Sequence, residues 1–293
     1  MVRVKLMRFG FIAAGVMFWI CSPGIVVAEK AADIKPKRIV SINICSDEIL
    51  LRLADRSRIA GVTTSALVPK LSSVVDLAQG LKTTYGSAEE VLLLEPDLVI
   101  AGGFYTRETV NILKKLGINV KVIKNPKNYD EVREHIRDIA EAVGEKEKGE
   151  ELIREMDMRL ERVRLKGIKP VNAIFYWPSG MTVGTDTLIS AIMESAGAHN
   201  IAGKINIKDN KILDHENLIL TDPDMIIVSD YRREVPTVSR QFLSHPVIRK
   251  RFGDLKTVAI PLSTIFCGSP VNVEATEFLS RRIEEYHLSD KRQ

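Results

Sequence analysis

Short runs of branched apolar residues alternate with longer amphipathic segments between residues 38 and 143. The runs at 38–42, 59–62, 98–101 and 120–123 have the length and composition of buried strands. The segments between them space their apolar residues three or four positions apart, which predicts helices, the longest at 129–143. Strands and helices that alternate in this way predict a parallel sheet with helices on both faces.

A long charged segment follows at residues 145–166. Its apolar residues form a narrow stripe at helical spacing: Leu152, Ile153, Met156, Leu160 and Val163. A disordered charged linker is the alternative, but the stripe favours a single long helix whose surface is mostly exposed to water.

A second alternating unit begins after Pro170. Strands are predicted at 173–176, 225–229 and 258–260, and helices at 187–196 and 271–286. Residues 197–201 are interpreted as a helix end followed by a turn. The predicted fold is therefore α/β, with two Rossmann-like lobes of parallel sheet joined by one long helix and a cleft between the lobes. The predicted domains are an N-terminal lobe (29–143), a connecting helix (144–168) and a C-terminal lobe (169–293).

The first 28 residues have a different character. Three basic residues precede an apolar run at 9–20, and a small-residue site ends at Ala28. This layout is typical of a cleaved secretory signal peptide, which predicts a periplasmic protein. A membrane anchor and a lipid-modified Cys21 are the alternatives. The apolar run is short for a membrane span, and the large residues before Cys21 suit lipidation poorly.

Composition and charge narrow the class of partner. The chain is 45% hydrophobic and 27% charged, as expected of a globular protein. It has 42 basic and 38 acidic residues, but three of the basic ones lie in the predicted signal peptide. The remainder is close to neutral, so no basic excess indicates nucleic acid as a partner.

One sequence unit occurs twice. Residues 89–100 and 216–228 each begin with a glutamate, continue through a short apolar segment to a Pro-Asp step, and end in a predicted strand. The repeat indicates that the two lobes are built alike. It also places Glu89 and Glu216 at the same position of each lobe.

The predicted cleft lies beyond the carboxyl ends of the strands, where ligands bind in open α/β sheets. Several aromatic residues, two arginines and two cysteines follow strand ends or adjoin these loops. The candidate ligand-binding residues are Cys45, Tyr85, Phe104, Tyr105, Arg107, Trp177, Tyr231, Arg232, Phe266 and Cys267. Core packing is the competing interpretation for the aromatic residues.

Two cysteines remain once Cys21 leaves with the signal peptide. Cys45 and Cys267 have three open interpretations: small buried apolar residues, soft ligands that touch a metal, or a bridge between the lobes. The sequence does not decide among them.

The order of elements and the paired Pro-Asp strands resemble the class III periplasmic substrate-binding proteins of ABC importers. Residues 38–43, 176–180 and 197–201 carry further resemblance to that family's opening strand and second lobe. The resemblance implies capture of cobalamin, a ferric siderophore or haem, and delivery to an inner-membrane permease with its ATPase. It implies no cofactor and a monomeric chain. In that family one glutamate on each lobe docks on permease arginines, which points to Glu89 and Glu216, with Glu90 as a nearby competitor.

Other functions are less well supported. Free zinc or manganese binding would need converging His and carboxylate ligands. None of the five histidines follows a predicted strand end, and His135 and His287 fall on helices, where a surface or capping role is expected. No metal site is therefore predicted.

An enzyme is the remaining rival. The sequence has no phosphate-binding Gly-Lys-Ser/Thr loop and no Gly-x-Ser-x-Gly elbow. No catalytic residue is assigned, although a dyad of Cys45 with a histidine, or a scaffold without a ligand, stays open.

Overall fold

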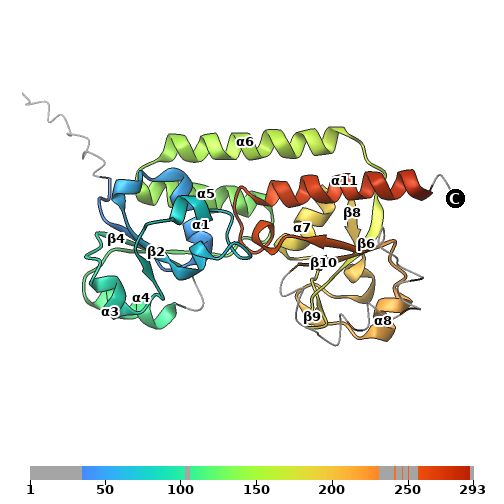
Figure 1. Cartoon of the computed structure of the whole chain (residues 1–293), viewed down its shortest axis with the longest axis horizontal. Coiled ribbons are helices and arrows are strands. Elements are labelled where there is room, and N and C mark those ends of the chain that lie inside the picture. Colours follow the sequence, from blue (N-terminus) through green and yellow to red (C-terminus); the bar gives the residue numbers. More distant parts are fainter. Residues whose placement is uncertain are drawn as a thin grey trace, which may run out of the picture. The chain divides into compact units, whose positions relative to one another are not determined.

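The computed structural model describes residues 35–102, 106–230, 241, 246, 250 and 257–290. The predicted signal peptide at 1–28 lies outside these ranges. From Lys35 onward the chain forms one compact unit built on two sheets (Figure 1). Within the described ranges, no helix combines the length and the apolar character needed to cross a membrane.

The first sheet is entirely parallel. Its strands are β1 (Ile39–Ser41), β2 (Ile59–Thr63), β3 (Thr83–Thr84), β4 (Leu98–Gly102) and β5 (Val120–Ile123), in the order β3-β2-β1-β4-β5. The connections hold helices α1 (Ile44–Leu53), α2 (Val75–Ala78), α3 (Ala88–Leu92), α4 (Arg107–Lys115) and α5 (Tyr129–Val143), and the 3₁₀ turns Arg56–Arg58 and Thr64–Leu67. The α/β prediction for this lobe is confirmed.

Side-chain caps fix where these helices begin. Asn43 accepts hydrogen bonds from the backbone N–H groups of Cys45 and Ser46 at the start of α1. Asn128 does the same for Glu131 at the start of α5. Such caps satisfy N–H groups that have no partner inside the helix. The cap on α1 places Cys45 directly beyond the carboxyl end of β1.

The second sheet is mixed. Its strands are β6 (Val171–Tyr176), β7 (Met181–Thr182), β8 (Ala198–Asn200), β9 (Lys211–Ile212), β10 (Met225–Ser229) and β11 (Thr257–Ile260), with the main order β11-β10-β6-β7-β9 and β8 on β6. Strand β7 pairs antiparallel with both β6 and β9, whereas β6, β8, β10 and β11 pair in parallel. Among the described residues this lobe also contains helices α7 (Leu188–Ser195), α8 (His215–Leu220) and α11 (Asn272–Asp290) and the 3₁₀ turns Ile201–Ile205 and Leu262–Thr264.

The interpretation of residues 197–201 as a turn is wrong in part, because β8 lies there. Ala198 and Asn200 are buried and His199 between them is exposed, which is the alternation of a strand. Three residues are too few for that alternation to be recognised in the sequence.

The long charged segment forms one helix, α6 (Lys146–Leu165), as predicted. Its buried residues lie along one stripe and include Ile153, Met156 and Val163. Figure 1 shows α6 running along α5 and α11, one helix from each lobe. At Gly149 the approach to α5 is so close that an added Cβ would stand 2.5 Å from the Cβ of Ala140. The helix therefore packs against both lobes along its length.

Buried side chains from both sheets belong to one continuous apolar core. It includes Ile39 of β1 and Phe175 of β6, together with residues of α5, α6 and α11. A shared core resists large changes in the relative position of the lobes, because such changes would expose apolar surface.

Candidate functional site at the lobe boundary and on the repeated units

The repeated sequence unit has the same structure in both lobes. Ser87 caps α3 by accepting from the N–H of Glu90, and Asp214 caps α8 by accepting from the N–H of Asn217. Glu89 and Glu216 are each the second residue after these caps, and both side chains are exposed. The structure thus places the two predicted docking glutamates at equivalent positions.

The Pro-Asp step has a structural role that the sequence did not reveal. In the first lobe the Asp97 carboxylate accepts from the backbone N–H groups of Lys37 (2.6 Å) and Arg38 (2.9 Å), next to β1. In the second lobe Asp224 accepts from the N–H of Asn172 in β6 at 2.8 Å. Each aspartate therefore ties the turn after the short helix to the first strand of its sheet.

The turn before each proline is also repeated. Glu95 and Asp222 have φ values of 47° and 46°, although non-glycine residues rarely adopt this left-handed conformation. Two equivalent residues share it, so the path from helix to strand is the same in both lobes.

Local hydrogen bonds distinguish Glu90 from Glu89. The Glu90 carboxylate accepts from the Thr84 hydroxyl at 2.7 Å and from the Tyr85 N–H at 2.8 Å. These bonds hold the pKa of Glu90 below its ordinary value, and the bond from the Thr84 hydroxyl has the largest effect. Glu90 is thus engaged within the chain, whereas the exposed Glu89 accepts no side-chain hydrogen bond from the described residues.

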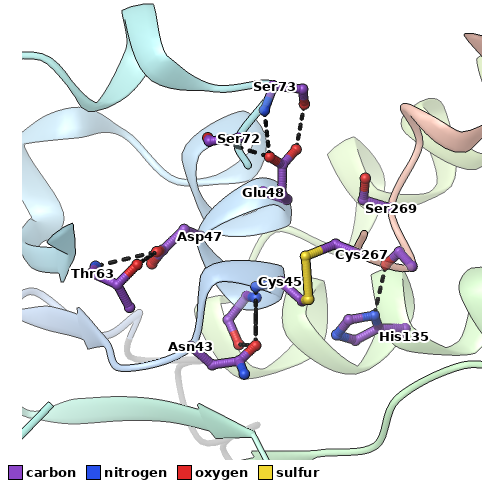
Figure 2. The surroundings of a disulfide bond; sticks show 12 residues. Asn43, Cys45, Asp47, Glu48, Thr63, Ser72, Ser73, His135, Cys267 and Ser269 are labelled. Atoms are coloured by element: carbon purple, nitrogen blue, oxygen red, sulfur yellow. Dashed lines mark hydrogen bonds between the residues drawn. A yellow bond between two sulfur atoms is a disulfide. The ribbon is translucent and has the colours of Figure 1, made fainter. Parts of the chain in front are cut away.

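A disulfide joins the two lobes. Cys45 in the first turn of α1 is bonded to Cys267, which follows β11, with 5.0 Å between their Cα atoms (Figure 2). The bridge is one of the three interpretations that the sequence left open. It leaves neither residue a free thiolate, so the alternative in which the cysteines ligate a metal is wrong, and so is a catalytic dyad through Cys45. Cys267 is buried, and Cys45 is half-buried.

The loop that carries Cys267 is packed tightly against the first lobe. A Cβ on Gly268 would come within 1.9 Å of Pro126, so only glycine fits there. The Gly268 carbonyl lies 2.9 Å from Nδ1 of His135 on α5 (Figure 2). The expected surface role of His135 is wrong, because this loop covers it. Burial lowers the pKa of His135 to about 4, so the ring is neutral and its Nδ1–H donates to the carbonyl.

Further polar contacts join α11 to α5 and to α6. The hydroxyl groups of Tyr129 on α5 and Thr276 on α11 lie 2.6 Å apart. The half-buried Arg159 of α6 makes two hydrogen bonds to the Glu277 carboxylate of α11. Together with the disulfide, these contacts tie α11 and the loop before it to α1, α5 and α6.

The remaining candidate ligand residues fall into two groups. Phe104, Tyr105, Tyr231 and Arg232 lie outside the described residues. Among the others, Trp177 follows β6, is half-buried and packs edge-on against Phe175, with ring centroids 4.8 Å apart. Phe266 is 48% exposed beside Cys267, Arg107 is exposed at the start of α4, and Tyr85 is 85% exposed before α3. Their role in ligand binding stays a prediction.

Metal ligands do not cluster in the described part of the chain. No group of three His, Cys, Asp or Glu side chains there is arranged to hold a metal ion.

Two buried carboxylates follow Cys45 in α1. Glu48 is paired with Arg52 at 3.0 Å and also accepts from the N–H of Ser73. Asp47 accepts from the N–H and hydroxyl of Thr63 (Figure 2). Burial raises the pKa of Asp47 to about 7, against the lowering effect of its hydrogen bonds from Ser41 and Thr63. Neither residue was predicted to belong to the functional site, since acidic residues are ordinary in a first helical turn.

We expect Asp47→Asn to change how stability depends on pH. The folded-state pKa of about 7 lies above the ordinary 3.8, so the wild type loses stability as pH rises through that window. The variant has no proton to lose there, and each pKa unit corresponds to about 1.4 kcal/mol. The free energy of unfolding is measured with urea at pH 5 and pH 8. Relative to the wild type, its value for the variant should be higher by roughly 1–3 kcal/mol at pH 8 than at pH 5.

The exposed Asp76→Asn serves as the matched control, with no such gain expected. A difference between Asp47→Asn and wild type that is the same at both pH values would contradict the buried-acid assignment.

Comparison with known proteins finds a matching family and several similar proteins. A family model described as "Periplasmic binding protein" matches residues 39–250. A cobalamin-binding protein of Halobacterium salinarum is 27% identical over 201 residues, which cover 67% of this chain and 54% of that protein. An uncharacterised ABC transporter substrate-binding lipoprotein of Bacillus subtilis, YvrC, is 27% identical over 212 residues, covering 67% and 64%. The chain thus spans about half the length of the first relative and slightly less than two thirds of the second.

A solved structure supports the same comparison. The periplasmic heme-binding protein RhuT from Roseiflexus sp. RS-1, in its apo form, superposes with a TM-score of 0.71 at 25% identity. The match covers 85% of this chain and 98% of that one.

Proposed function

Because the chain belongs to the periplasmic binding protein family, we propose that it is the solute-binding component of an ABC importer. It captures a metal chelate in the periplasm. The chelate is an iron siderophore, haem or a corrinoid. It then delivers the chelate to an inner-membrane permease coupled to an ATPase. The signal-peptide pattern of residues 1–28 supports export, and the chain acts as a monomer.

The observation that carries this proposal is the repeated unit with an exposed glutamate on each lobe. Glu89 and Glu216 both lie two residues after a side-chain cap and are exposed, and both are followed by the same turn and by an aspartate bonded to the first strand of its lobe. Two carboxylates held at a fixed separation suit a partner that presents two basic sites. A dimeric permease is such a partner, since its subunits repeat each site.

The chemistry of the exposed candidate residues supports a large chelate more than a bare ion. Trp177 and Phe266 offer partly exposed aromatic surface, and Arg107 offers an exposed guanidinium. Aromatic surface suits the flat face of a macrocycle or a chelator, and guanidinium suits its carboxylates. The relatives include proteins named for cobalamin and for heme, which is why both stand beside siderophores in the proposal.

The connection between the lobes suggests how capture and release proceed. The disulfide, the shared core and the Arg159–Glu277 pair oppose wide opening of the lobes. We therefore expect release to follow small movements when the permease contacts both lobes, with no chemical change in the ligand. A secreted enzyme is the second candidate, but no described constellation of nucleophile and base favours it over binding.

Equilibrium titration tests this function. We expect the purified protein to bind one equivalent of haemin, cyanocobalamin or ferrichrome with a dissociation constant of roughly 1 µM or lower. Absorbance of the chelate and quenching of tryptophan fluorescence report binding, and mass spectrometry of the released ligand reports any chemical change. The proposal would be contradicted if the protein bound none of the three chelates, or if it chemically changed any of them.

A further inference from the structure

Each exposed glutamate of the repeated units has an exposed leucine one helical turn further on. Leu93 follows Glu89 by four residues, and its N–H bonds to the Glu89 carbonyl at 3.2 Å, so the two share one helical face. Leu220 follows Glu216 by the same four residues at the end of α8. The leucine side chains are 82% and 70% exposed.

The inward faces of these helices match as well. Val91 of α3 and Leu218 of α8 are fully buried at equivalent positions, so each short helix is already anchored in its lobe. Leu93 and Leu220 are therefore not needed to fill the core. One exposed leucine is ordinary on a protein surface. The same exposed leucine beside the same glutamate in both lobes indicates a surface made for contact.

We propose that Leu93 and Leu220 are part of the docking surface, so that each lobe presents a carboxylate and an exposed leucine side chain to the permease. The inference rests on the proposed function, because it describes the partner of that function in more detail. The permease would carry, twice, a basic side chain with an apolar recess about one helical turn, or about 5 Å, away. The charge pairs set the orientation and the leucines add desolvated contact.

A permease suits this surface better than a second copy of the chain. Figure 1 shows α3 and α8 on the side of their sheets that faces away from α6, where one partner can reach both. Each patch consists of one glutamate and one leucine, whereas a stable homodimer buries on the order of 1,200–2,000 Å². Self-association through this face would also bring Glu89 and Glu216 against one another, and like charges repel.

The test is the affinity for a permease–ATPase complex of the source organism, reconstituted in nanodiscs. Four proteins are compared at low and high salt: wild type, Leu93→Ala with Leu220→Ala, Glu89→Ala with Glu216→Ala, and a control. The control pair, Leu165→Ala with Leu288→Ala, removes leucines that are 69% and 58% exposed on α6 and α11. Thermal melting of each variant checks that the fold is kept.

We expect the Leu93/Leu220 pair to weaken binding about ten-fold or more with the salt dependence of wild type. The Glu89/Glu216 pair should weaken binding and reduce the salt dependence, and the control should match wild type. If the leucine pair binds like wild type while the glutamate pair does not, the inference is wrong and the proposed function stands. If wild type itself fails to bind the complex, both are wrong. A wild-type dimer that the leucine substitutions dissociate would identify a second copy as the occupant and overturn the inference.

Discussion

Replacing Glu89 and Glu216 together by alanine is expected to reduce import by more than about ten-fold while ligand capture stays intact. Both carboxylates are exposed on the surface of short, anchored helices, so their loss leaves no internal polar group without a partner. Their proposed partners in the permease would be left as unpaired cations at the contact. The measurement is uptake of the identified chelate into vesicles that contain the permease and ATPase.

The matched control is Glu147→Ala with Glu151→Ala, which removes two exposed carboxylates from the first turns of α6. It keeps the same net charge as the docking variant, so a general charge effect would appear in both. Glu90→Ala is a second comparison, because Glu90 is bonded to Thr84 and Tyr85 inside the chain. Normal uptake by the Glu89/Glu216 variant would refute the docking assignment.

Removal of the disulfide by Cys45→Ser with Cys267→Ser is expected to lower stability substantially. The bond closes a loop with a sequence separation of 222 residues. A chain-entropy argument gives about 5 kcal/mol for a loop of that size, as an upper value. For a domain of this length that corresponds to a fall in melting temperature of about 10 °C. Differential scanning calorimetry with and without reductant measures the effect.

Reductant supplies the internal control for this prediction. Reduced wild type should melt like the double variant, and the double variant should be insensitive to reductant. Thiol titration of the unfolded wild type should find Cys45 and Cys267 unreactive until reductant is added. A melting temperature within about 2 °C of wild type for the variant would contradict a stabilising bridge between the lobes.

Much of the fold could be predicted from the sequence because its periodicity is strong. The strand at 120–123 and the helix at 129–143 have the bounds that their apolar spacing indicates. The strands β3, β7 and β9 have two residues each, too few for any period to be recognised. Their pairing depends on neighbours that fold beside them, which sequence spacing does not express.

The candidate site was predictable only where the signal is local or repeated. Duplication makes Glu89 and Glu216 candidates for docking, and only the structure shows that Thr84 and Tyr85 donate hydrogen bonds to Glu90. The pairing of Cys45 with Cys267 depends on how the lobes approach each other. So does the burial of His135 beneath the loop at Gly268. Contacts between residues distant in the chain leave no mark in the spacing of apolar residues.

Native mass spectrometry of the protein exported by its own cells tests the central claim most directly, namely that the chain captures a metal chelate. The account predicts one metal chelate per chain, released intact on unfolding and identified by its mass and absorbance. A chain that carries no metal-containing ligand, and takes none up from the medium in which its cells grow, would contradict the account.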